Sequence, residues 1–261
     1  MEKLISALNR LYLRPGAFPE DALLRQLRGE HTQALSLAGP DGLMRAAMIP
    51  FARVDADGSH WTRLCDAANG LQQELGLPAP AVSISGDGAY GLWLSLAEPA
   101  PVEQMQAFVD ALHARYFPDM AAPGPVSAPL ELPPCLHQAS GKWAAFIHPG
   151  MGASFADEAG LDLPPPAAGQ AAFLDELDSI APAAFAQALA SLRPAGGAPQ
   201  STSSAAASAP PGARPDAGRP RGCCSRMQPS RTSLPGCMRG ISSPASAMCC
   251  LPGVNRRISS Y

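Results

Sequence analysis

Residues 43–61 read LMRAAMIPFARVDADGSHW, and this stretch organises the predicted fold. Its first half holds an apolar run from Ala46 to Phe51, and its second half carries Asp55 and Asp57 one residue apart. In a strand, side chains repeat with a period of two, so both carboxylates would project from one face. Neighbouring carboxylates repel each other unless a cation lies between them. The pair therefore predicts a site for Mg²⁺ or Mn²⁺, which prefer oxygen ligands, although Asp and Gly are also ordinary turn residues.

The strand that carries the acids is predicted to run from about residue 43 to 57. Phe51 would share the face of the two acids, and Ala52, Val54 and Ala56 would face the core. Pro50 lies inside this strand and cannot donate a ladder hydrogen bond. It therefore implies an edge position, a bulge or a break.

On either side of this stretch, hydrophobic spacing and turn residues predict the remaining elements. The expected helices cover residues 2–13, 19–29, 59–75 and 101–112, and the expected strand pairs are 33–38 with 43–57, 81–85 with 92–96, and 130–136 with 142–147. The central order is β-α-β-β-α-β. That order predicts an α+β fold with a ferredoxin-like or RRM-like sheet and helices on one face.

Composition divides the chain into four parts. Residues 1–29 form N-terminal helices, 30–150 the central domain, and 151–193 an extension with one amphipathic helix over 173–192. Residues 194–261 are rich in Ser, Pro, Gly, Arg and Cys, and such a segment is predicted to be disordered. Its Cys-Cys pairs among Arg and Pro are also typical of GC-rich DNA translated in the wrong reading frame, so this tail has two explanations.

Charge and cysteine usage exclude several classes of protein. The 261 residues carry a net charge of −3, which gives no general attraction to nucleic acid or membranes. No apolar run is long enough to cross a bilayer, and the first residues lack signal-peptide features, so a cytoplasmic location is expected. The seven cysteines form no CxxC pair, so no zinc ribbon or redox motif is predicted. His60, His113 and His148 lack metal-ligand spacing and are expected at the surface.

Several motifs, taken together, resemble the archaeo-eukaryotic primase (primase-polymerase) superfamily, and most closely the primase domain of the TOTE conflict systems. That branch carries a DxD, a Trp, a helix and then SxSGxGxHxW, followed by Phe-Pro and Leu-Pro segments and a glycine-containing turn. The similar residues here cover about residues 30–150: His31, Asp55-Ala56-Asp57, Trp61, the run SISGDGAYGLW at 83–93, Phe117-Pro118, Leu132-Pro133 and Ser140-Gly141-Lys142-Trp143.

The resemblance implies template-directed nucleotidyl transfer, with nucleoside triphosphates and a DNA or RNA template as partners. In such a mechanism Asp55 and Asp57 hold two ions of Mg²⁺ or Mn²⁺, which activate a 3′-hydroxyl and stabilise the leaving group. The turn Ser85-Gly86-Asp87-Gly88 would contact the nucleotide. Glycines let a backbone approach a phosphate with its N–H groups, but Gly-Asp-Gly also suits an ordinary hairpin.

The sequence departs from the family pattern at several positions. The family's histidine, which contacts the triphosphate, falls at Tyr90, whose phenol is neutral, and one extra residue precedes Trp93. Asp119 and Glu131 are the candidates for a third metal acid. His137 and Lys142 flank a turn and would either bind phosphate or be solvated.

These features leave three functions open. The three candidates are an active primase-polymerase, a non-catalytic module that binds nucleotide or nucleic acid, and an interaction domain that keeps only the fold. The acid pair favours the first, and the substitution at Tyr90 favours the second.

Overall fold

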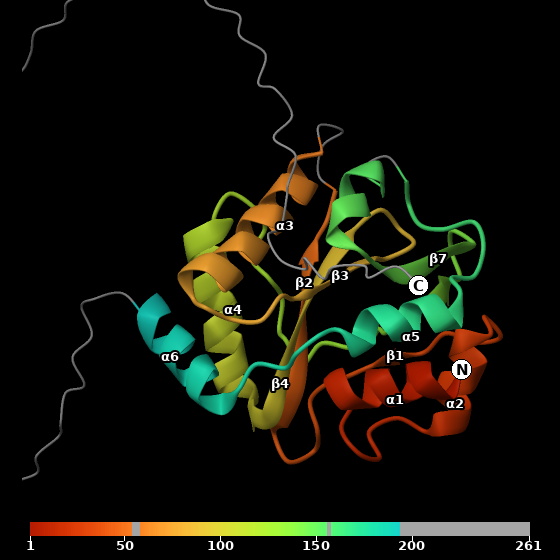
Figure 1. Ribbon diagram of the computed structural model, residues 1–261, viewed down its shortest axis with the longest axis horizontal. Helices are drawn as coiled ribbons and strands as arrows, with labels where there is room; N and C mark the ends of the chain where they lie inside the picture. Colours follow the sequence, from red (N-terminus) through yellow and green to blue (C-terminus); the bar gives the residue numbers. More distant parts are fainter. Residues whose placement is uncertain (54–57, 156–157, 194–261) are drawn as a thin grey trace, which may run out of the picture. The chain divides into compact units, whose positions relative to one another are not determined.

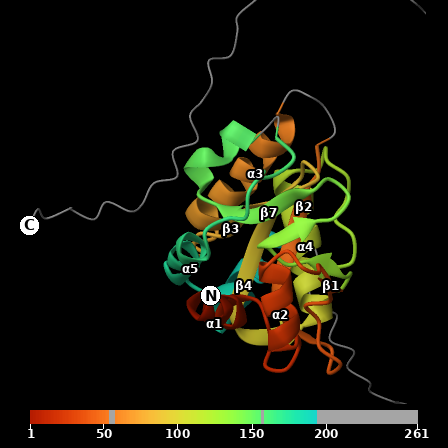
Figure 2. The ribbon, with the colours of Figure 1, turned by 90° about the vertical axis from the view of Figure 1, so that its right-hand side faces the viewer.

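A five-stranded antiparallel sheet forms the centre of this α+β fold (Figures 1 and 2). A computed structural model describes residues 1–53, 58–155 and 158–193; Asp55, Asp57 and the tail from 194 lie outside the described residues. The strands are β1 (Ala34–Leu35), β2 (Leu43–Phe51), β3 (Ala81–Ile84), β4 (Tyr90–Pro101), β5 (Leu130–Glu131), β6 (Cys135–His137) and β7 (Lys142–Ile147). The sheet has the order β2-β4-β3-β7-β6, and β1 pairs separately with β5.

Helices cover both faces of the sheet. They are α1 (Glu2–Leu11), α2 (Glu20–Leu27), α3 (Ser59–Asn69), the π-helical turn η1 (Gly70–Glu74), α4 (Val102–Tyr116), the 3₁₀ segment η2 (Pro149–Phe155), α5 (Ala167–Asp175) and α6 (Pro182–Leu192). In Figure 1, α3, α4 and α6 lie on one side of the sheet and α1 and α5 on the other. Among the described residues, no helix is long and apolar enough to span a bilayer.

Aromatic clusters form the core on each face. On the α4 side, Phe51 packs on Phe117 with ring centroids 5.0 Å apart. On the α1 side, Tyr12 contacts Trp93 at 5.1 Å and stacks on Phe146 at 5.5 Å. Both clusters bury apolar surface, so the sheet is stabilised by packing on both faces.

The predicted chain order β-α-β-β-α-β is present, but the strands are not in the ferredoxin-like order. In a ferredoxin-like sheet the fourth strand pairs with the first, whereas here β7 pairs with β3. The link after α4 explains the difference. Residues 123–130 lie against Met48 and Pro50 at the outer edge of β2, and the chain continues into β5, which pairs with β1. The β6–β7 hairpin therefore joins the sheet on the side opposite to β2.

Three further predictions need correction. The strand 33–38 was expected to pair with the next strand, but β1 pairs with β5, and only a bridge between Ala38 and Met44 links it to β2. The predicted helix 173–192 is divided into α5 and α6, because Ile180 between them bonds the edge of β4 through the Ser95 carbonyl and the Ala97 amide. Pro182 then starts α6 at a favoured position.

The third correction concerns the end of β2. The strand ends at Phe51, which is fully buried on the α4 face, while Ala52, predicted to face the core, is exposed. Phe51 lies on the core-facing side of the strand, where its ring packs against the ring of Phe117. The edge position implied by Pro50 is confirmed, since β2 is the outermost strand, and a register shift lies between Met44 and Ala46.

Candidate functional site

A groove of about 280 Å³ opens on the sheet face opposite α3 and α4. Its floor comes from the central strands, because Pro50, Gly91 and Ser83 are cross-strand neighbours and so project to the same face. The full lining is Met48, Pro50, Ser83, Ser85, Asp87, Ala89, Tyr90, Gly91, Trp93, Glu131, Pro133, His137 and Ala144. A mostly apolar floor with a few polar groups at the rim is typical of small-ligand sites.

The floor is tightly packed around Gly91. A Cβ at this position would lie 2.8 Å from Ser83 Oγ and 3.2 Å from Met48 Cγ, so no larger residue fits without a shift. Trp93 Nε1 donates a hydrogen bond to Ser83 Oγ over 2.8 Å, which fixes the indole beside it. The floor is therefore rigid.

Tyr90 directs its side chain away from the groove. Its register partners are Phe51 and Ile84, so the ring lies on the α3 face, where it packs on His60 and Trp61 at 5.0 and 4.9 Å. Its hydroxyl donates to the Gly152 carbonyl over 2.7 Å. Tyr90 thus borders the groove with its backbone only. Alternation along β4 places Gly91 and Trp93 on the groove face and Tyr90 on the opposite face.

The environment of Tyr90 also corrects one expectation and agrees with another. His60 is 2% exposed, not at the surface as predicted, because α3 brings its ring onto Tyr90. Trp61 is buried beside it, as expected for a core residue.

The backbone amides of the glycine turn between β3 and β4 already donate hydrogen bonds within the protein. Ser85 Oγ accepts from the amides of Asp87 and Ala89 and contacts the Asp87 carboxylate. The Gly88 amide donates to the Ala159 carbonyl over 3.1 Å. Three of the N–H groups that an anion would need are therefore already bonded, and a phosphate would have to displace those bonds.

Gly86 has a different role, because it allows the β6–β7 hairpin to approach the turn closely. Its φ is +83°, and a Cβ there would lie 2.7 Å from the His137 Cβ and 3.1 Å from the Lys142 carbonyl. The absence of a side chain lets the β6–β7 hairpin lie directly on the turn. Of the residues predicted from the sequence, Ser85 and His137 thus line the groove together, with Gly86 packed against His137, while Gly88 belongs to the same turn but is not part of the lining.

Ser140, which sequence reasoning did not single out as a site residue, joins the two hairpins. Its Oγ donates to the Gly86 carbonyl over 2.6 Å, contacts His137 Nδ1 at 2.8 Å and accepts from the Lys142 amide at 3.2 Å. This serine belongs to the segment Ser140-Gly141-Lys142-Trp143 of the resemblance, but its hydrogen-bond partners become visible only when the chain folds.

Lys142 does not direct its ammonium group to the groove. Its Nζ donates to the Asp162 carboxylate, and this bond raises the pKa of Lys142. The charge that the sequence offered for phosphate binding is therefore paired with a carboxylate from the segment before α5.

The two third-acid candidates lie in different places. Glu131 lines the groove, as does Asp87. Asp119 receives two hydrogen bonds from Arg63 on α3, at 2.9 and 2.5 Å. Hydrogen bonding from Arg63 is the largest cause of the lowered pKa of Asp119. Within the described ranges, no three His, Cys, Asp or Glu side chains are grouped closely enough to hold a metal ion.

The acid pair itself lies outside the described residues, but the strand before it ends near the groove. Phe51, the last residue of β2, pairs with Tyr90, the first residue of β4 after the glycine turn. The chain that continues to Asp55 and Asp57 therefore leaves the sheet at the same end as that turn.

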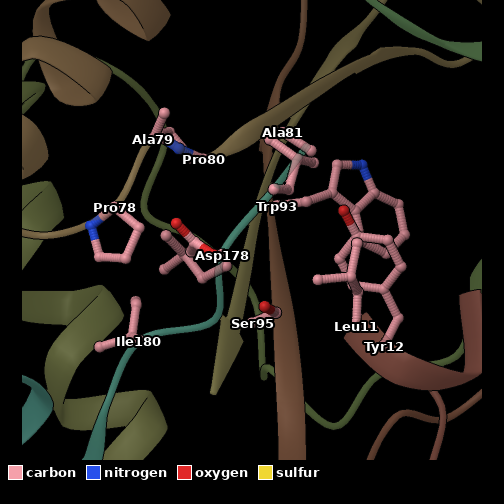
Figure 3. A pocket seen from close by; sticks show the side chains of 12 residues that line it. Leu11, Tyr12, Pro78, Ala79, Pro80, Ala81, Trp93, Ser95, Asp178 and Ile180 are labelled. Carbon is pink, nitrogen blue, oxygen red and sulfur yellow. The ribbon is translucent and has the colours of Figure 1, made fainter. Parts of the chain in front are cut away.

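A second cavity, of about 10 Å³, has room for no more than one water molecule (Figure 3). Figure 3 shows the rings of Trp93 and Tyr12 on one side of it and Pro78 and Ile180 on the other. Its size excludes a substrate, and the groove of about 280 Å³ is also larger than the cavity of about 130 Å³ between β2 and residues 123–130, so we take the groove as the candidate site.

Comparison with known proteins gives no relative for this chain. No protein-family model matches it, and no curated protein matches it. The arguments for function therefore rest on the groove and on the motifs of the sequence.

Proposed function

We propose that the chain is a primase-polymerase-like protein that binds a nucleoside triphosphate in the groove and transfers its nucleotidyl group in a metal-dependent reaction. The observation that supports the proposal is that Ser85 and His137 both line one groove and that Gly86 packs directly against His137. These residues come from hairpins some fifty positions apart in the sequence. The β-α-β-β-α-β chain order also agrees with the proposal, while the position of β7 departs from an RRM-like sheet.

The proposed reaction depends on a divalent ion that Asp55 and Asp57 would bring to the groove. Asp87 and Glu131 place carboxylates at its rim, and three turn amides are already bonded, so the described residues alone would repel a triphosphate. Asp55 and Asp57 would hold Mg²⁺ or Mn²⁺, with Glu131 as third acid, and the ion would supply an activated 3′-hydroxyl and a stabilised leaving group. The protein's own residues would orient the sugar and base against the rigid floor of Gly91 and Trp93.

The experiment is extension of primed DNA and RNA templates by the full chain with Mg²⁺ or Mn²⁺. We expect labelled product that is lost in Asp55→Asn and Asp57→Asn and reduced by about 10²-fold or more in Glu131→Gln. Asp119→Asn is the matched control, because that acid bonds Arg63 outside the groove, and it should keep activity. Equal activity in the Asp55 and Asp57 variants would contradict the proposal.

A second candidate is a non-catalytic module that binds nucleotide or single-stranded nucleic acid. It is favoured by the engagement of Tyr90 with Gly152 and of Lys142 with Asp162, because both side chains are then occupied away from any phosphate. This candidate predicts binding that persists in a metal chelator and no product under any condition. The transferase predicts binding that requires the ion.

A further inference from the structure

The contacts of Ser140 determine how the proton on His137 is placed. Ser140 Oγ lies 2.6 Å from the Gly86 carbonyl oxygen, and a carbonyl has no proton to give. Two oxygens at that distance need a hydrogen between them, so the hydroxyl proton of Ser140 points to Gly86. The hydroxyl then has only lone pairs left for its other contacts.

The second step concerns the imidazole. His137 Nδ1 lies 2.8 Å from the same Oγ, whose proton is already committed, so Nδ1 must be the donor. The amide of Lys142 donates to the second lone pair of Ser140 Oγ over 3.2 Å. One donated and two accepted bonds complete the capacity of a hydroxyl, which leaves no room for the opposite proton placement.

The third step follows from the two ring nitrogens of a neutral imidazole. If Nδ1 carries the proton, Nε2 carries a lone pair and can only accept. His137 lines the groove, and no group in the described part of the chain bonds its Nε2. The lone pair is therefore left for a ligand.

We infer that Ser140 is a positioning residue that holds neutral His137 with its proton on Nδ1, so that Nε2 accepts a hydrogen bond from a sugar hydroxyl of the bound nucleotide. The nucleotide as ligand rests on the proposed function. An acceptor in the lining of this groove selects a hydroxyl and not a phosphate oxygen, which has no proton to donate. His137 thus reads the sugar, while the phosphates depend on the metal.

The first test is the proton position in the full chain without ligand, read from the ¹⁵N chemical shifts of His137 at about pH 8.5, where an imidazole is ordinarily neutral. We expect the Nδ1–H form in the native protein and in Ser140→Thr, which keeps the hydroxyl. In Ser140→Ala the Nε2–H form should gain population, and thermal unfolding of both variants checks that they fold. An Nε2–H form in the native protein, or no change in Ser140→Ala, would overturn the inference.

The second test measures the affinity of the full chain for ribonucleoside and 2′,3′-dideoxynucleoside triphosphates with Mg²⁺. Native protein should prefer the ribonucleotide by about three- to tenfold, the range for one hydrogen bond, and His137→Phe should lose that preference. An unchanged preference in His137→Phe contradicts the reading of the sugar. Failure of every nucleotide to bind contradicts the proposed function, and in that case the ¹⁵N measurement still decides the role of Ser140.

Discussion

Gly86 and Gly88 are two glycines of one turn with different requirements. Both have positive φ, +83° and +97°, but only a Cβ at Gly86 meets other atoms within 4 Å. We expect Gly86→Ala to lower the free energy of unfolding by about 2–4 kcal/mol, from backbone strain plus displacement of the hairpin. Gly88→Ala, which carries the strain alone, should cost about 1–2 kcal/mol. Urea denaturation measures both, and equal losses would show that the approach of His137 does not constrain the turn.

Asp41 provides a pH-dependent contribution to stability. Its carboxylate accepts two hydrogen bonds from the Arg14 guanidinium and one from the Leu43 amide, and the Arg14 bonds, as the largest cause, lower the pKa of Asp41 to about 2. A folded pKa below the unfolded value of about 3.9 means that the stabilisation is present above that value and is lost as pH falls toward 2. We expect the free energy of unfolding of Asp41→Asn to fall less steeply than that of the native protein between pH 4 and 2.

The carboxyl titration of Asp41, followed by NMR, provides the control. In Arg14→Gln the pKa of Asp41 should move back toward its ordinary range. A titration that stays where it was in Arg14→Gln would assign the shift to the Leu43 amide instead.

At single positions, the sequence predicted which residues lie near the site better than it predicted the direction in which each side chain points. Pairing of Gly86 with a nearby His137 could not be deduced, because they meet only through the sheet order. Tyr90 was expected at the nucleotide on an ungapped match, but alternation along β4 turns it to α3. One inserted residue reverses the face of a strand side chain, and nothing local in the sequence reveals which neighbour absorbs the insertion.

Gln170 on α5 replaces a strand beside β7. Its Oε1 accepts from the Phe146 amide at 2.9 Å and its Nε2 donates to the Phe146 carbonyl at 2.8 Å, where β6 no longer pairs. Gln170→Met would leave both buried backbone groups without partners, and we expect a loss of about 2–4 kcal/mol in chemical denaturation. Gln187→Met, at an exposed position of α6, should change stability by less than about 0.5 kcal/mol. Similar values for the two variants would show that Phe146 finds other partners.

Helices were predicted more accurately than strand partners. The spacing of apolar residues in 2–13 and 101–112 depends on contacts one turn apart, so α1 and α4 were found close to their observed bounds. Pairing of β1 with β5 joins residues almost a hundred positions apart, and no local signal specifies it. The same reason explains why the position of β7 was missed.

The core crosses the boundaries that composition suggested at residues 29 and 150. Tyr12 before the first boundary contacts Trp93 and Phe146, and Phe185 after the second contacts Phe108 at 5.2 Å. Residues 1–193 belong to one compact unit. We therefore expect a fragment of residues 30–150 to show a collapsed amide NMR spectrum and no cooperative thermal transition, because it lacks Tyr12 and Phe185, the aromatic partners contributed from outside it. A dispersed spectrum from that fragment would establish it as an independent domain.

The outer edge of β2 has a consequence for association. A free edge strand normally offers a row of amides to a second chain, and long apolar edges of that kind seed fibres. Here Pro50 removes one donor, the register shift near Met44 interrupts the row, and the proline-rich segment 123–130 lies against the strand. Copies of this protein should consequently resist stacking through β2 even when crowded.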